Sequence, residues 1–309
     1  LVGLILATPI SWYWGCRRLG FGQLEALVAA LTIPLFAAEH DVGAGMRTLT
    51  YTGLYAQSWG LLLAPLVLGI VASEFGDRNA DRAGVCRVGI GFLLLGLTHV
   101  LVAIWTGIAA LVLVATRSRE ALRWFVLAIG LAAIAAAFWV IPVFLYSDLA
   151  GGLPWRREWQ TGAPLGDLVG NVLSGSILDS GRTPWMTFAL LLSLPAAWNR
   201  RSEPSVQWSV AVGAISLVLC LGRAGLGSAY EWLPFHSEMN AARYVLGVHI
   251  AAGLLLGVGA SAIATRDSRR SLVLLIATAV LIGANVTELR GSLRSFNIDE
   301  ADYLALRRH

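Results

Sequence analysis

The sequence predicts an all-α protein, a polytopic transmembrane helical bundle of about ten spans. Three observations predict this fold. Of the 309 residues, 57% are hydrophobic and only 14% are charged, with a mean hydropathy of +0.68, whereas about 25% of residues are charged in soluble domains. The apolar residues gather in runs that approach the ~20 residues a helix needs to cross a bilayer. The links between runs carry clusters of arginine, and the chain has no lysine.

Five apolar runs are expected to form the helices of the first half of the chain: residues 1–14, 24–38, 58–73, 88–116 and 124–146. The fourth run is long for one span and short for two. Because arginines flank it on both sides, we predict a hairpin of two short helices that turns between His99 and Gly107. One long tilted helix is the alternative.

Four further spans are predicted at residues 185–198, 208–221, 244–264 and 272–286. The transmembrane domain then covers residues 1–287, with outside loops at 39–57, 147–184 and 222–242, and residues 288–309 form an extracytoplasmic tail. In this topology 13 arginines lie in inside loops and 6 in outside loops, which agrees with the positive-inside rule. A nine-span chain would reverse every loop after Thr116 and remove this bias.

The excess of positive charge in the chain does not indicate a nucleic-acid partner. The net charge is +4 and the pI about 9.3, but the arginines fall between apolar runs, where they set orientation. The three cysteines are far apart and form no metal-binding pattern. Eight tryptophans near span ends are expected to form an interfacial belt: Trp12, Trp14, Trp59, Trp124, Trp185, Trp198, Trp208 and Trp232.

Three consecutive ionisable residues, Glu39, His40 and Asp41, follow the second predicted span. Carboxylates at such a position could act as general base toward an acceptor hydroxyl, so Glu39 and Asp41 are the candidate catalytic residues. The triplet could also hold a divalent cation, Mg²⁺ or Mn²⁺. A solvated helix end is the alternative interpretation.

A second candidate is His99, a histidine in the predicted hairpin. It is either a satisfied structural residue or a ligand of a phosphate or sugar in a wet cavity.

A third candidate is the loop with His236 and Glu238, which leads to Arg243 at the start of a span. A guanidinium there can form hydrogen bonds to two oxygens of a phosphate, and the helix N-terminus adds partial positive charge. The alternative interpretation is that Arg243 only anchors the span to lipid headgroups. His249, further along the same span, is expected to be buried, and facing the same cavity as Arg243 is one interpretation of its position.

The loop at 147–184 places Trp155 and Trp159 beside charged residues. Aromatic rings stack on sugars, and they also rest on bilayers, so the sequence does not separate a sugar site from an interfacial loop.

Three segments carry a resemblance to a bacterial membrane family. They are GLTHVLVAIWTGIAALVLV at 96–114, AAFWVIPVFLYSDL at 136–149 and LPFHSEMNAARYVLG at 233–247. They resemble the 6-pyruvoyl-tetrahydropterin-synthase-related membrane-domain proteins and the YfhO-like membrane proteins, which look like members of the GT-C glycosyltransferase superfamily. In such enzymes the catalytic acid usually lies in the first outside loop. Here we expect that loop, with the first span, to lie upstream of Leu1.

The resemblance implies a membrane glycosyltransferase in the bacterial plasma membrane. It would transfer a hexosyl or pentosyl group from a polyprenyl-phosphate sugar to a glycan or protein acceptor on the extracytoplasmic face, with Arg243 contacting the lipid-linked phosphate. The implied partners are membrane lipid, the donor and the acceptor. Two other functions stay open from the residues alone: a lipid-linked-sugar transporter or flippase, and a non-catalytic membrane scaffold.

Overall fold

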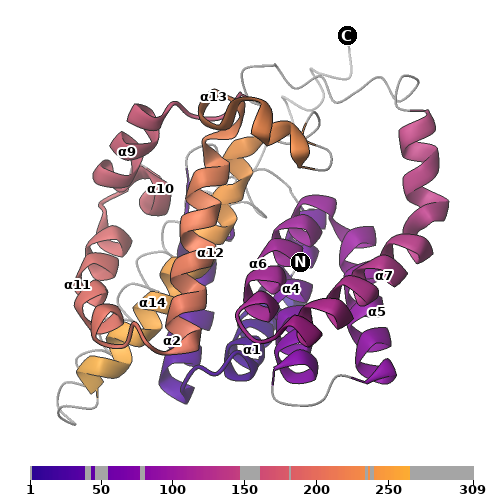
Figure 1. The fold of residues 1–309 in the computed structure, drawn as a ribbon. Coiled ribbons are helices and arrows are strands. Elements are labelled where there is room, and N and C mark those ends of the chain that lie inside the picture. Colours follow the sequence, from indigo (N-terminus) through magenta and orange to yellow (C-terminus); the bar gives the residue numbers. More distant parts are fainter. Residues whose placement is uncertain are drawn as a thin grey trace, which may run out of the picture.

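The computed structural model describes residues 2–38, 43–45, 55–76, 81–146, 161–180, 182–233, 236 and 240–264. These residues form helices, joined by turns, and one isolated backbone bridge between Ala37 and Asp179. Figure 1 shows the helices gathered into one bundle. The all-helical fold class that the composition predicts is therefore confirmed for the described part of the chain.

The helices of the first half coincide with the predicted apolar runs. They are α1 (Val2–Arg18), α2 (Gln23–Thr32) with the 3₁₀ turn η1 (Ile33–Leu35), α4 (Tyr55–Phe75), α5 (Arg82–Thr98), α6 (Val100–Ala115) and α7 (Arg119–Leu145). Side-chain caps start three of them: Asp81 Oδ1 accepts from Gly84 N at 2.6 Å in α5, His99 Nδ1 accepts from Val102 N at 3.3 Å in α6, and Ser118 Oγ accepts from Ala121 N at 3.0 Å in α7. The break between α5 and α6 falls at His99, so the long run is two helices, as predicted.

The second half adds α9 (Leu165–Ser174), α10 (Ser176–Asp179), α11 (Trp185–Asn199), α12 (Pro204–Cys220), α13 (Gly222–Leu226), η3 (Gly227–Trp232), η5 (Ala241–Tyr244) and α14 (Val245–Ala264). Two of the predicted outside loops thus contain short helices of their own. The predicted span at 272–286 and the tail at 288–309 lie outside the described residues.

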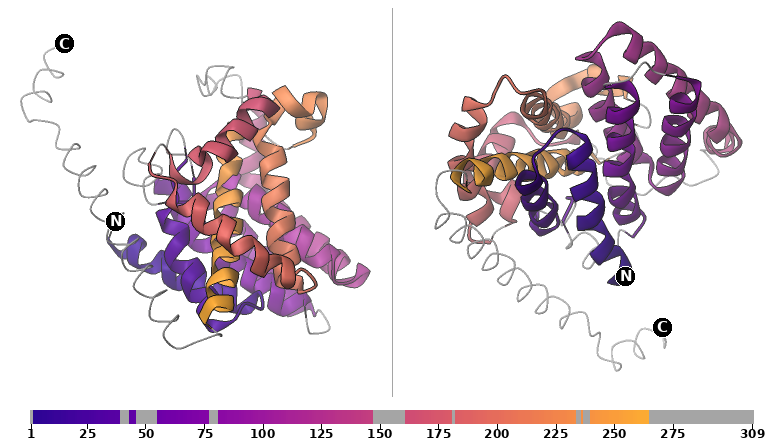
Figure 2. Two further views of the ribbon diagram at one scale, coloured as in Figure 1. Left: turned by 90° about the vertical axis from the view of Figure 1, so that its left-hand side faces the viewer. Right: turned by 90° about the horizontal axis from the view of Figure 1, so that it is seen from below.

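Helix α14 lies at the centre of the bundle. It packs against α2, α11 and α12, while α2 packs on α1, α1 on α4, and α4 on α5 and α6. Figure 2 shows α14 between α2 on one side and α11 and α12 on the other. Every residue from Val245 to Ala260 is buried, so α14 makes its contacts with protein on all sides.

Glycines allow this close packing around α14. A Cβ on Gly257 would lie 2.4 Å from the carbonyl oxygen of Glu25, and one on Gly259 would lie 2.2 Å from the Ser193 hydroxyl. Small residues let helix backbones approach where no hydrophobic driving force acts between them in lipid. These glycines therefore serve the packing of α14 against α2 and α11.

A charged cluster joins α2 to the α11–α12 turn at the predicted inner end. Arg200 Nη1 pairs with Glu25, whose side chain is 5% exposed, and Arg200 Nη2 lies 2.6 Å from Glu203 Oε2. The hydrogen bond from Arg200 lowers the pKa of the Glu203 carboxyl. Glu25 also accepts from Gly22 N at 2.8 Å, so this buried carboxylate is paired, as burial of a charge requires.

Length and composition make three described helices candidates for membrane spans: Ala56–Phe75, Arg119–Pro142 and Ala241–Ala264. A fourth candidate is the pair Pro204–Cys220 and Gly222–Trp232, which bends by 94°. The apolar surface of the bundle is compatible with an integral membrane protein. The count of ten spans stays a prediction.

The tryptophan belt is only partly as predicted. Trp59, Trp185, Trp198 and Trp232 are exposed, whereas Trp12 and Trp208 are buried at 0% and 3% exposure. Trp208 Nε1 donates to Ala109 O at 2.8 Å and thereby ties α12 to α6. The prediction was wrong for Trp12 and Trp208 because the position of a residue along a helix does not reveal which face of the helix it occupies.

Candidate functional site

Arg243 lies in η5, the short turn that leads into the central helix α14. Asn240 starts this turn, because its Oδ1 accepts from Ala242 N at 2.9 Å and its carbonyl oxygen accepts from Arg243 N at 3.0 Å. The Arg243 side chain is half-buried. Its position next to a helix N-terminus adds the partial positive charge of the helix to that of the guanidinium, and this combination favours an anion.

The structure brings His99 into the electrostatic range of Arg243. Burial is the main cause that lowers the pKa of His99 to about 4, and the positive charge of Arg243 is the second. His99 lies between α5 and α6, outside the candidate spans. Its ring is therefore neutral near pH 7. The charge of Arg243 acts on it although the two residues are 144 positions apart in the sequence.

The orientation of His99 follows from its role as a cap of α6. Its Nδ1 accepts from Val102 N at 3.3 Å, and its backbone is extended with φ −162°. An acceptor Nδ1 in a neutral imidazole places the hydrogen on Nε2, an assignment that rests on this hydrogen bond. No described residue accepts from that Nε2–H, so His99 offers a neutral donor close to the cation of Arg243.

Two glycines bring other segments to the same end of the bundle. Gly162 has φ +78°, and a Cβ there would lie 2.3 Å from Leu221 O; Gly222 has φ +53°, and a Cβ there would lie 2.7 Å from Ala241 Cβ. Only glycine adopts such conformations without strain. The two predicted outside loops therefore contact each other and the start of η5, two residues before Arg243.

The outside loop at 147–184 contains an amphipathic helix, α9, among its described residues. Leu165, Val169, Val172 and Leu173 are exposed at 63%, 47%, 42% and 80%, and their spacing places them on one face of the helix. An exposed apolar face of this kind suits the headgroup boundary of a bilayer. The candidate sugar-stacking residues Trp155 and Trp159 precede α9 and lie outside the described residues.

His249 is a structural residue. Its exposure is 0%, its Nδ1 accepts from Ala44 N at 3.1 Å, and its Nε2 lies 2.7 Å from the carbonyl oxygen of Ile177. Both ring nitrogens are thus used within the fold, and Phe36 packs 5.2 Å from the ring centre. His249 is buried, as expected, and holds three chain segments together.

Glu39, His40 and Asp41 lie outside the described residues, but the chain on both sides of them is anchored. Ala37 N donates to Leu178 O at 3.0 Å, and Gln57 Nε2 donates to Gly43 O at 3.0 Å. No group of three metal-ligating residues occurs within the described part of the chain. The proposed roles of the triplet as base or as cation ligand stay predictions.

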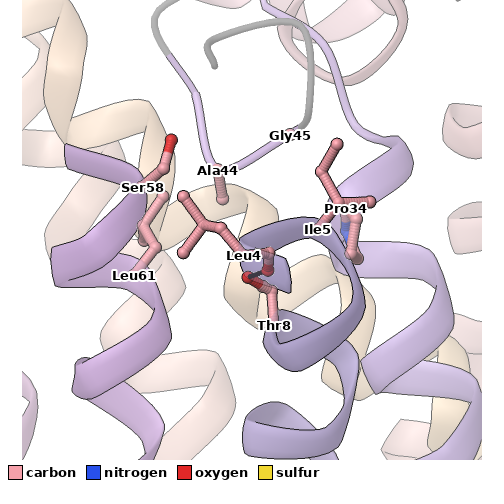
Figure 3. Close-up of a pocket in the computed structure, with 8 residues that line it drawn as sticks. All are labelled: Leu4, Ile5, Thr8, Pro34, Ala44, Gly45, Ser58 and Leu61. Carbon is pink, nitrogen blue, oxygen red and sulfur yellow. Dashed lines mark hydrogen bonds between the residues drawn. The ribbon is translucent and has the colours of Figure 1, made fainter. Parts of the chain in front are cut away.

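A cavity lies beside the residues that follow the triplet. Figure 3 shows its lining from α1, α4, η1 and the 43–45 segment: Leu4, Ile5, Thr8, Pro34, Ala44, Gly45, Ser58 and Leu61. Its volume is about 20 Å³. This volume holds about one water molecule and is too small for a sugar, so this cavity does not hold a donor sugar.

His236 and Asp179 make local contacts. The Nδ1 of His236 lies 3.3 Å from Leu233 O, within its own turn. Asp179 is 2% exposed and accepts from Met186 N at 3.1 Å and Thr187 N at 3.0 Å. Asp179 therefore caps α11, a role that its place in a polar loop does not reveal. Glu238 lies outside the described residues.

Comparisons with protein-family models, curated proteins and solved structures found no match for the chain.

Proposed function

We propose that the chain is the membrane domain of a glycosyltransferase that uses a polyprenyl-phosphate-linked sugar donor on the extracytoplasmic face. In this proposal the bundle has about ten spans and is GT-C-like, and the product is a cell-envelope glycan. The observation that carries the proposal is that Arg243, in the turn that leads into the central helix, lies within electrostatic range of His99. A phosphodiester fits this pair, because it needs one cation and further hydrogen-bond donors.

The proposed reaction is the one that the resemblance implies, and the two residues would bind the phosphate of the donor. An acceptor hydroxyl attacks the anomeric carbon, and the bond from that carbon to the phosphate oxygen breaks. Negative charge grows on the departing phosphate, where the Arg243 guanidinium stabilises it and the His99 Nε2–H donates a hydrogen bond. The hydroxyl proton passes to a carboxylate, for which Glu39 and Asp41 are the candidates.

The test compares two arginines of the same region. Arg223 is exposed and pairs with Glu231, so Arg223→Ala is the matched control for Arg243→Ala. We expect Arg243→Ala to lower transfer from a panel of polyprenyl-phosphate sugars by about 10²-fold or more, while Arg223→Ala keeps wild-type turnover. Arg243→Lys should recover only part, since an ammonium lacks the two-pronged geometry of the guanidinium. Wild-type turnover in Arg243→Ala would remove the residue from the mechanism.

A second candidate function, a lipid-linked-sugar transporter or flippase, is favoured by one observation. Helix α12 and the α13–η3 segment meet at 94°, as a broken span or a re-entrant loop would. Transporters use such discontinuous helices near their substrate sites. A proteoliposome assay with labelled polyprenyl-phosphate sugar decides: movement of the label without a new glycosidic bond would favour transport over transfer.

A further inference from the structure

A larger cavity lies at the opposite end of the bundle from Arg243, where α1 and α4 meet the start of α5. Its volume is about 420 Å³. Three arginines dominate its lining, which consists of Trp14, Arg17, Arg18, Ile70, Ala72, Ser73, Glu74 and Arg87. The sequence indicates only an orienting role for these arginines, and the structure shows in addition that they share one cavity.

The walls of this cavity are set by close contact between α1 and α4. A Cβ on Gly69 would lie 2.6 Å from the Trp14 ring and 3.1 Å from Arg18 Cβ, so the glycine lets both side chains approach α4. The Arg18 guanidinium lies 5.1 Å from the centre of the Trp14 ring, and its Nη1 donates to Ser73 Oγ at 3.3 Å. Arg17 Nη1 donates to Phe21 O at 2.7 Å.

The cavity carries an excess of positive charge. Arg87 is balanced by Glu74, whose two oxygens accept from Nε at 3.0 Å and from Nη2 at 2.8 Å. Within the described part of the chain, no carboxylate lies within ion-pair distance of Arg17 or Arg18. Two guanidinium groups are therefore available to an anion that enters from outside.

The surroundings favour a lipid as the source of that anion. Ser73 and Glu74 lie at the end of the candidate span Ala56–Phe75, which is the depth of the headgroups. Along α1 an exposed apolar stripe leads toward the cavity, with Leu6 at 64% and Ile10 at 70% exposure. Acyl chains can cover this stripe while the phosphate reaches the arginines.

We propose that this cavity binds the headgroup of an anionic phospholipid, with Arg17 and Arg18 contacting the phosphate and Trp14 at the interface. Basic pockets at the ends of transmembrane helices suit such headgroups. The site is independent of the proposed transferase site at the other end of the bundle. It makes the stability of the α1–α4 contact dependent on the lipid composition of the leaflet.

The experiment measures binding of phosphatidylglycerol to the purified full chain by native mass spectrometry, with phosphatidylcholine and inorganic phosphate as the comparison probes. The variant is Arg17→Gln/Arg18→Gln. The control, Arg119→Gln/Arg123→Gln, removes the same charge from exposed arginines at the start of α7. A direct hydrogen bond from a charged donor to the phosphate contributes at least about tenfold to affinity. We therefore expect the first pair to weaken phosphatidylglycerol binding by about tenfold or more, and the control, whose arginines do not line the cavity, to change it little.

A second variant, Ser73→Leu, places a bulky apolar side chain in the cavity wall next to Arg18, removes the hydroxyl that accepts from Arg18, and leaves every charge in place. We expect this variant to weaken phosphatidylglycerol binding as well. Its binding tests the proposal if the double arginine variant does not fold. Unchanged binding by Ser73→Leu, or equal losses in the two arginine pairs, would show diffuse attraction and overturn the proposal. Inorganic phosphate that binds as tightly as the lipid would overturn the lipid as the source.

Discussion

Replacement of His249 by phenylalanine tests whether this histidine acts as a structural connector. The imidazole joins the 43–45 segment, α10 and α14 through Ala44 N and Ile177 O. Phenylalanine keeps an aromatic ring next to Phe36 but offers neither a donor nor an acceptor. The change therefore removes two hydrogen bonds, and the larger ring also crowds the neighbouring Gly43.

The loss in the free energy of unfolding follows from the two backbone groups that lose their hydrogen-bond partner. The amide of Ala44 and the carbonyl of Ile177 face a ring with 0% exposure, so we expect no water to replace the imidazole. An unsatisfied buried polar group costs about 1–3 kcal/mol, which gives about 2–6 kcal/mol for the pair. His249→Gln should lose less, because its amide supplies one donor and one acceptor.

The cysteines of the chain provide the assay. Cys16 and Cys220 are buried and Cys86 is exposed, so in a Cys86→Ser background a thiol-reactive dye reports the opening of the core. We expect His249→Phe to lower the melting temperature by at least ~4 °C, at roughly 2 °C per kcal/mol. His236→Phe is the control, because the His236 ring is half-buried and makes one local contact. This substitution should change the melting temperature little. An unaltered melting temperature in His249→Phe, or a loss of phosphodiester binding at full stability, would refute the structural role.

Two further predictions concern the α1–α4 contact and the candidate site. Gly15→Ala places a Cβ 2.5 Å from Pro65 O and should destabilise the bundle by about 1–3 kcal/mol, measured in the same thiol assay. Gly3→Ala is the control, because its Cβ would meet nothing within 4 Å, and it should leave the stability unchanged. Equal effects of the two substitutions would contradict the close packing of α1 on α4. The pKa of His99, lowered to about 4, should rise when a phosphodiester binds, so the bound state holds more protons and affinity should increase as the pH falls, by up to about tenfold per unit. His99→Gln should remove this dependence, and its persistence would exclude His99 as the titrating group.

The positions of the helices were predictable because they depend on local properties of the chain. Apolar runs bounded by arginines or by capping residues such as Asp81 and Ser118 place helix ends within a few residues. The break at His99 was also predictable, since charges on both flanks of the run favour two helices. The same reasoning predicts a polar loop at 147–184 and misses α9, because α9 is too short and too rich in glycine to stand out as a span.

The contacts that join distant segments were not predictable from the residues alone. Nothing in the sequence indicates that His249 meets Ala44 and Ile177, or that Glu25, a single carboxylate in an apolar run, pairs with Arg200. A lone acid within a predicted span does signal a buried partner, but it does not identify that partner. Trp208 shows the same limit, because a tryptophan near a span end can face either lipid or a neighbouring helix.

The central position of α14 bears on how Arg243 can act. Val245 to Ala260 are buried on all sides, His249 is held through both ring nitrogens, and Gly257 contacts the backbone of Glu25 at the far end. A helix fixed in this way cannot shift without breaking several contacts at once, so the turn that carries Arg243 starts from a rigid base. A guanidinium on a rigid base does not have to be oriented when charge develops on a bound phosphate, and this preorganisation makes electrostatic stabilisation effective. It follows that substitutions that loosen α14, such as His249→Phe, should reduce transfer more than they reduce binding of the lipid carrier, because binding tolerates a displaced arginine better than charge stabilisation does.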